Sequence, residues 1–379
     1  MSLNKMYIIQ AFFLVCLLFS QESNCQNNSI TIDLDELKLV DVEASELFNN
    51  ISTIILEPNP YSIISSVRGL HVFDKQFIFL FERFGNGGLF MYDFQGRFLR
   101  IIGREHNILD ITIDPVKRDI YMLAANRRTM HIYDFNGKHI NSINFSQGEG
   151  LHRIQFYNDK IYMVSNQPID YLVRVFDVKS GKITEGYLPV SDNIWSRFIM
   201  FESFYNRANG VPKFIHPFFS NFLSLKDMKP YVSMKSKNFP TALEIERILR
   251  HNDEISQITE ISRLTGVRNF RHYFESENLI YFAYTAELSD NLSILHNKRI
   301  NTTHHFKISN NLLYQKSVNL FNFSCFDENG AYEIYTAGEF INIRDRNLLN
   351  SNIDKRNRLS SINNESNPII FYYEFKNPK

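Results

Sequence analysis

Three segments of this chain share one pattern at a spacing of about 40 residues, and this repeat constrains the fold more than any other feature. The copies are Leu89–Ile101 (LFMYDFQGRFLRI), Met130–Ser142 (MHIYDFNGKHINS) and the shorter Val173–Lys182 (VRVFDVKSGK). An aspartate marks the same position in each copy, with spacings of 41 and 43 residues: Asp93, Asp134 and Asp177. A repeat of this length built from strands is typical of a β-propeller.

Each copy has the pattern of two strands joined by a tight turn. In the first copy, Phe90, Tyr92 and Phe94 alternate with Met91 and Asp93, and alternation with period two indicates a strand. A glycine supplies the positive φ that a short hairpin turn needs, at Gly96, Gly137 and Gly181. We expect the aspartate before each turn to bind backbone N–H groups of that turn rather than a ligand.

Two more strand patterns precede each hairpin. One is seen in Asp119–Leu123 and Lys160–Val164, and the other in Ile108–Ile113 and Leu151–Phe156. Four short antiparallel strands make one propeller blade. We therefore predict an all-β propeller of four-stranded antiparallel blades, with aromatic residues, 14% of the chain, packed between the sheets.

The number of blades is ambiguous from the period alone. About 340 residues at this period would form eight blades. The repeat is absent from residues 191–270, however, so we favour six blades with insertions around 191–270, in a single domain of residues 26–379. Within this insertion, Leu243, Ile245, Ile248 and Leu249 follow Pro240 at helical spacing, which indicates a short helix or an insertion between strands.

The chain begins with the features of a secretory signal peptide, which we place at residues 1–25. Lys5 precedes an apolar core, Met6–Phe19, of about 14 residues, whereas a bilayer-spanning helix needs about 20. A retained membrane anchor is the alternative. Cys25 stands where a lipoprotein carries its lipidated cysteine, but residues 22–24 match a lipidation signal poorly. A lipid tether at Cys25 is therefore a second possibility, and we expect Cys325 to be a buried free thiol.

A closed propeller needs its two chain ends in one sheet, because closure removes the exposed edges. The final strand pattern, Ile369–Phe375, is strongly apolar. We predict that it pairs with Ile30–Leu34 to close the ring.

Charge and motifs exclude several kinds of function. The chain has 41 basic and 41 acidic residues, so nucleic acid is not an expected partner. Gly85–Gly88 precedes a strand and lacks the Lys-Ser/Thr of a phosphate-binding loop. His304 and His305 would point to opposite faces of a strand and would not share a metal ion. We predict no metal site and no cofactor.

Polar residues between strands or near blade junctions are the candidate binding residues, because binding groups concentrate on loops that a rigid scaffold holds. Trp195 joins them as an aromatic residue that could stack on a sugar, although a core position is the alternative. The candidate set is Arg104, Glu105, His106, Arg127, Arg128, His152, Arg153 and Trp195.

The chain resembles the six-bladed β-propeller proteins common in gut and oral Bacteroidetes, which are distantly similar to NHL-repeat propellers. The resemblance lies in the D-x-I-Y strand, the hairpin h-x-h-[YF]-D-x-x-G-[KR], in which h is hydrophobic, and the ending Asn367–Lys376. Similar proteins often have G-x-G-P-G-E-Y after the first hairpin, where this chain has Gly103–Asn107, so binding at that loop can differ here. The resemblance implies a fold and an exported location, but no reaction.

Two functions remain open at this stage. The first is an exported, non-catalytic binding or scaffold protein of the bacterial envelope, monomeric, with a glycan, peptide or envelope protein bound at the loops around the channel mouth. The second is a hydrolase or lyase at the same place, which would need paired carboxylates or clustered histidines and carboxylates. No catalytic residue can be named from the sequence.

Overall fold

We analysed a computed structural model of the chain. It describes residues 29–58, 64–82, 87–145, 150–165, 170–189, 204–205, 211–216, 220–251, 256, 259–260, 263–264, 267–286, 290–314, 323–350, 353 and 359–376. The predicted signal peptide with Cys16 and Cys25, and Trp195 in the insertion, lie outside the described residues.

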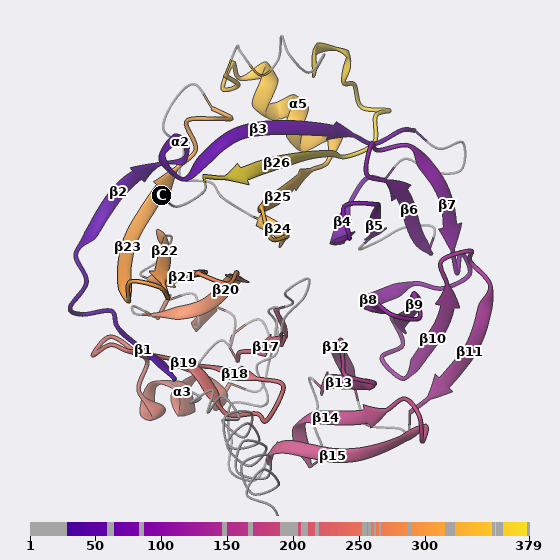
Figure 1. Cartoon of the computed structure of the whole chain (residues 1–379), viewed down its shortest axis with the longest axis horizontal. Helices are drawn as coiled ribbons and strands as arrows, with labels where there is room; N and C mark the ends of the chain where they lie inside the picture. Colours follow the sequence, from indigo (N-terminus) through magenta and orange to yellow (C-terminus); the bar gives the residue numbers. More distant parts are fainter. Residues whose placement is uncertain are drawn as a thin grey trace, which may run out of the picture.

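Six small sheets surround a central axis (Figure 1). Blade 1 consists of β4 (Val67–Phe73), β5 (Phe77–Glu82), β6 (Leu89–Asp93) and β7 (Phe98–Ile102). Blade 2 consists of β8 (Ile108–Asp114), β9 (Asp119–Ala124), β10 (Thr129–Asp134) and β11 (His139–Asn144). Blade 3 consists of β12 (Leu151–Tyr157), β13 (Lys160–Ser165), β14 (Tyr171–Asp177) and β15 (Lys182–Pro189). In each blade the chain runs from the innermost strand outward.

The second half of the ring contains the irregular sequence. Blade 4 consists of β16 (Phe204–Tyr205), β17 (Lys213–Phe214), β18 (Asn221–Ser224) and β19 (Pro230–Lys235). Blade 5 consists of β20 (Arg268–Glu275), β21 (Leu279–Ala286), β22 (Asp290–Asn297) and β23 (Thr302–Ser309). Blade 6 consists of β24 (Phe323–Phe326), β25 (Gly330–Tyr335), β26 (Ile369–Phe375) and β3 (Phe48–Ile55). The predicted six-bladed propeller of four-stranded blades is confirmed.

The N-terminal segment runs around the outside of blades 4, 5 and 6 (Figure 1). There β1 (Ile30–Asp33) and β2 (Leu39–Glu43) add parallel fifth strands to β19 and β23, and β3 pairs antiparallel with β26. The prediction that Ile30–Leu34 closes the ring with Ile369–Phe375 is therefore wrong. The C-terminal part of the chain contributes only three strands to blade 6. The fourth strand does come from the N-terminal segment, but it is β3, which begins eighteen residues after β1.

Local sequence signals explain the regular half of the ring. The Oδ1 atom of Asp93 accepts hydrogen bonds from two backbone N–H groups of its turn at 2.9 and 3.0 Å. Asp134 Oδ1 accepts from the Lys138 N–H at 2.8 Å and Asp177 Oδ1 from the Ser180 N–H at 2.6 Å, which confirms the capping role of the repeated aspartates. Between blades 1 and 2, the ring of Phe135 packs against three phenylalanine rings of blade 1 at centroid distances of 5.3–5.5 Å: Phe73, Phe77 and Phe79.

Helices are few and lie outside the blades. The expected helix is α3 (Ala242–Leu249), between blades 4 and 5, and the Thr241 and Glu244 side chains form a capping box at its start. The others in the described part of the chain are α2 (Ala44–Leu47), α5 (Ala337–Asp345) and the 3₁₀ turn η3 (Leu359–Ser361). None of the described helices has the length and apolar character needed to cross a membrane.

Candidate functional site

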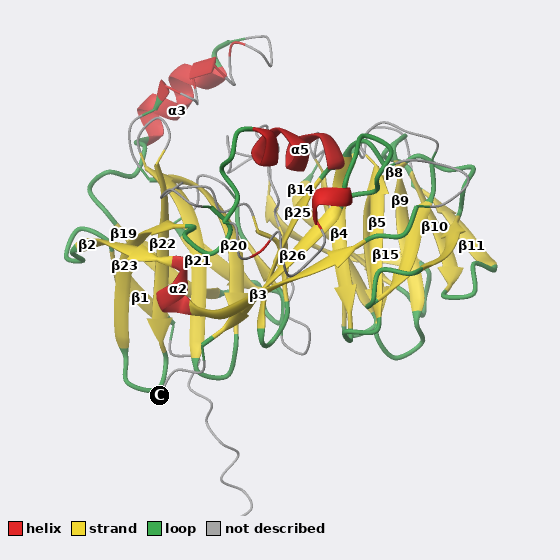
Figure 2. Ribbon diagram, turned by 90° about the horizontal axis from the view of Figure 1, so that it is seen from above, coloured by secondary structure: helices red, strands yellow, loops and turns green. Residues whose placement is uncertain are grey.

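The candidate binding residues of blades 1 to 3 lie at one end of the propeller. Strand order places the loops that join successive blades at the same end as the loops between the second and third strands of a blade. Figure 2 shows this end at the top, where α3 and α5 project, and we call it the upper face. Backbone bonds join neighbouring loops there: Ala125 donates to Asn107 at 2.7 Å, and Leu151 donates to Arg127 at 3.0 Å.

A first group, the histidine cluster, extends from the loop between blades 1 and 2 along the outer strands of blade 2. It consists of Glu105, His106, His131, Tyr133 and His139. The rings of His106 and His131 stack at a centroid distance of 3.6 Å. The Tyr133 hydroxyl lies 3.0 Å from His106 Nε2 and donates to Glu105 Oε1 at 2.8 Å. His139 packs edge-on against Tyr133 at 5.0 Å.

Members of the histidine cluster shift one another's pKa values, but they are not arranged to bind a metal ion. Burial, followed by the two neighbouring rings His106 and His139, lowers the pKa of His131. Burial and the Glu105 carboxylate raise the pKa of Tyr133. Among the described residues, no group of three or more His, Cys, Asp or Glu side chains is placed to hold a metal ion.

A second group, the arginine cluster, consists of Arg68, Asp110, Arg127, His152 and Arg153. Arg68, Asp110, His152 and Arg153 belong to the innermost strands of blades 1, 2 and 3, and Arg127 lies in the β9–β10 loop. Arg68 Nε donates to the Leu109 carbonyl at 2.9 Å. Asp110 Oδ2 accepts from the Ile154 N–H at 2.8 Å, and its Oδ1 lies 4.0 Å from Arg153 Nη1. These contacts connect the three inner strands in order around the axis.

Burial and the neighbouring arginines shift the pKa values of the titratable groups in and near this cluster. Burial, followed by Arg153, Arg127 and Arg68, lowers the pKa of His152 to about 3. Burial and Arg153 lower the pKa of His71, also on β4, to about 4. Burial raises the pKa of Asp110, against the opposing effects of Arg153 and the Ile154 N–H. Both histidines are therefore neutral at pH 7.

The structure brings the predicted residues together in two sets rather than one. Glu105 and His106 belong to the histidine cluster, and Arg127, His152 and Arg153 belong to the arginine cluster. Arg104 and Arg128 are exposed on the same face. Sequence reasoning missed the other five members of the two clusters, which lie in strands and carry no loop signal: Arg68, Asp110, His131, Tyr133 and His139.

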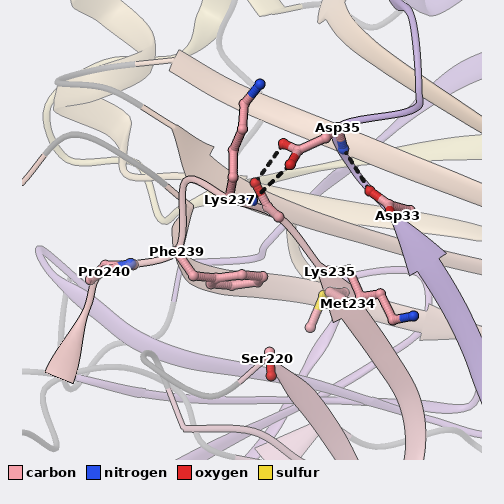
Figure 3. A pocket seen from close by; sticks show the side chains of 9 residues that line it. Asp33, Asp35, Ser220, Met234, Lys235, Lys237, Phe239 and Pro240 are labelled. Atoms are coloured by element: carbon pink, nitrogen blue, oxygen red, sulfur yellow. Dashed lines mark hydrogen bonds between the residues drawn. The ribbon is translucent and has the colours of Figure 1, made fainter.

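A separate pocket of about 500 Å³ lies where β1 and β19 end, near the start of α3 (Figure 3). Asp35 accepts hydrogen bonds there from the Lys237 N–H at 2.7 Å and the Ser236 hydroxyl at 2.9 Å. These bonds lower the pKa of Asp35. Asp33 accepts from the Asp35 N–H at 3.1 Å. The Asp35 carboxylate thus holds the N-terminal segment against the end of blade 4.

Fold and site together define a six-bladed propeller whose inner strands carry a basic cluster on one face. Residues 29–374 match the family model described as "Domain of unknown function (DUF4934)". The chain belongs to this family. No curated protein is significantly similar to it.

Two solved structures from Bacteroides share the fold. The first, called "Putative exported protein", is from Bacteroides fragilis and is 12% identical, with a TM-score of 0.73 over 92% of this chain and 100% of that one. The second is a DUF4221 family member from Bacteroides vulgatus, 14% identical, with a TM-score of 0.50 over 88% of this chain and 98% of that one. The resemblance to Bacteroidetes propellers is thus supported at the level of fold, and the relation to NHL repeats stays a prediction.

Proposed function

We propose that this protein is an exported, non-catalytic propeller of the bacterial envelope that binds a ligand on its upper face. Three sequence-predicted residues, Arg127, His152 and Arg153, come together there from a loop and an inner strand, and this observation carries the proposal. Binding sites are commonly formed by convergent polar groups on loops that a rigid scaffold holds in place. The fold shared with the "Putative exported protein" of Bacteroides fragilis supports the exported location.

The arginine cluster favours binding over catalysis. Glycoside hydrolysis needs two carboxyl groups on either side of the scissile bond. In the part of the chain that the structure describes, the charged groups that perturb His152 are all guanidiniums, and Asp110 is occupied by a backbone N–H. The ligand would be a glycan, a peptide or an envelope protein.

A thermal-shift screen of the purified protein tests this proposal. A ligand that binds only the native state raises the melting temperature by mass action. We expect a glycan or peptide to produce a shift that Arg153→Gln reduces. The matched control is Arg299→Gln, which removes the same charge from an exposed turn at the opposite end of blade 5.

Two results would contradict the proposal. A ligand-induced shift that is equal in wild type, Arg153→Gln and Arg299→Gln would place binding elsewhere. A shift produced only by a divalent metal and reversed by chelator would favour the hydrolase or lyase alternative.

A further inference from the structure

The arginine cluster contains hydrogen-bonding groups that have no partner among the described residues. His152 is only 8% exposed, and neither of its ring nitrogens has a hydrogen-bond partner among the described residues. Within the same described part of the chain, the Arg127 side chain forms no hydrogen bond or ion pair, and Arg153 has only the long 4.0 Å approach to Asp110. Buried polar side chains normally have partners, so this combination is characteristic of a recognition site.

The backbone holds these groups at one place. The hydrogen bond of 3.0 Å from the Leu151 N–H to the Arg127 carbonyl joins the β9–β10 loop to the first residue of β12. His152 and Arg153 follow directly. Arg127 itself has a φ angle of 61°, which is unusual for a residue other than glycine and is often found at functional positions. The loop therefore presents the Arg127 guanidinium from a fixed and strained backbone.

The charges select the ligand chemistry. Arg127 and Arg153 are guanidiniums, which present planar sets of N–H donors suited to two-point binding of a carboxylate. The one carboxylate in the cluster, Asp110, already accepts from the Ile154 N–H at 2.8 Å. A neutral His152 between arginines adds a donor without adding a charge.

We propose that the arginine cluster binds a carboxylate group of an acidic ligand, with Arg127 and Arg153 as the charged donors and His152 as a neutral one. This inference rests on the proposed function and specifies its ligand. An acidic sugar and an acidic peptide both carry the required group. A neutral glycan does not.

Calorimetric titration with matched probes tests the carboxylate and its source. The probes are a galacturonic acid trimer, a galactose trimer of the same length, and a short glutamate-containing peptide with its glutamine counterpart, all at one ionic strength. We expect one acidic probe to bind at least about tenfold more tightly than its neutral counterpart, because charge-assisted hydrogen bonds are stronger than neutral ones. The acidic probe that binds identifies the source of the carboxylate.

Substitutions then locate the binding. Arg127→Gln and Arg153→Gln should each weaken the acidic probe at least about tenfold, whereas Arg299→Gln should change it less than about twofold. Arg127→Gln removes no side-chain hydrogen bond or ion pair within the described structure, so loss of binding by this variant with an unchanged melting temperature would not come from unfolding.

The protonation of His152 provides a second measurement. A bound carboxylate favours the protonated imidazole, so the pKa of His152 should rise from about 3 when the acidic probe is present. A titration of the histidine ring signals by NMR measures this shift, and the signal is assigned by its loss in His152→Gln.

Three outcomes would overturn the carboxylate proposal, and they affect the proposed function differently. If a neutral probe binds as tightly as its acidic counterpart and depends on Arg153, the proposed function stands and the carboxylate is wrong. If an acidic probe binds but both glutamine variants bind it normally, the arginine cluster is not its site. If no probe binds and no ligand is found in the thermal-shift screen, both proposals fail.

Discussion

Removal of the Tyr373 hydroxyl tests how the ring-closing blade is stabilised. In β26 this buried hydroxyl donates to Glu333 Oε2 at 2.8 Å and accepts from Asn310 Nδ2 at 2.9 Å. Both partners are almost fully buried, at 1% and 0% exposure. A hydrogen bond to a charged group contributes about 1.5–3 kcal/mol. We therefore expect Tyr373→Phe to lower the free energy of unfolding by about 2–3 kcal/mol.

The phenylalanine keeps the aromatic packing of the site. The rings of Phe48 and Phe323 lie 5.4 and 5.6 Å from the Tyr373 ring, and these contacts do not need the hydroxyl. The adjacent Tyr372 is the control, because this residue is only partly buried and its hydroxyl accepts from Lys75 Nζ at 3.1 Å. Tyr372→Phe should cost less than about 1 kcal/mol, as is usual for exposed polar contacts.

Urea unfolding of the two variants, followed by circular dichroism and fluorescence, measures both free energies. Each variant removes one hydroxyl, so a difference between their losses of stability reports the burial of the Tyr373 site. Equal losses of stability in Tyr373→Phe and Tyr372→Phe would refute the argument that the buried carboxylate needs the Tyr373 hydroxyl.

Three further perturbations have defined outcomes. Gly96→Ala should destabilise the protein by clearly more than Gly181→Ala in urea unfolding. Both glycines have positive φ, but only at Gly96 would the new Cβ meet a backbone oxygen of β3, at 2.5 Å, so equal losses would contradict the contact. Burial opposes ionisation of Glu275, but Lys213 and other partners outweigh burial and lower the pKa of this carboxyl group. The stabilising effect of the Glu275 carboxylate is therefore complete above about pH 4.5 and is lost as the pH falls through the folded pKa. Glu275→Gln should remove this part of the stability–pH curve. Burial and a nearby guanidinium lower the pKa of His71 to about 4, so stability should fall as the pH drops from 6.5 towards 4, and an NMR titration midpoint of its ring near 6.5 would contradict this.

Local signals made the blades predictable from the sequence. Alternation of apolar residues, a glycine in each hairpin turn and an aspartate before it all act between residues a few positions apart. These interactions are therefore visible in the sequence of residues 89–182, and the structure confirms them. The helix at Ala242–Leu249 was predictable for the same reason, since its capping box spans only Thr241 to Glu244.

The candidate site was only partly predictable. Arg127 lies in the β9–β10 loop, and His152 and Arg153 lie near the start of β12, so their place at a predicted blade junction gave a reason to choose them. Arg68 and Asp110 lie inside inner strands, and their polar partners are 41 and 44 residues away. Nothing in their local sequence distinguishes them from ordinary strand residues. Their role depends on the packing of one blade against the next.

The sequence by itself determined the repeating unit, its turns and the number of strands in each regular blade, because those features depend on near neighbours. The tertiary structure alone decided how the ring closes. Ile30–Asp33 has a strand pattern that would fit several edges, yet it pairs with β19 of blade 4, and Phe48–Ile55 completes blade 6. The choice of edge depends on which blade lacks a fourth strand and how far the chain reaches around the ring, and neither is a property of the strand itself.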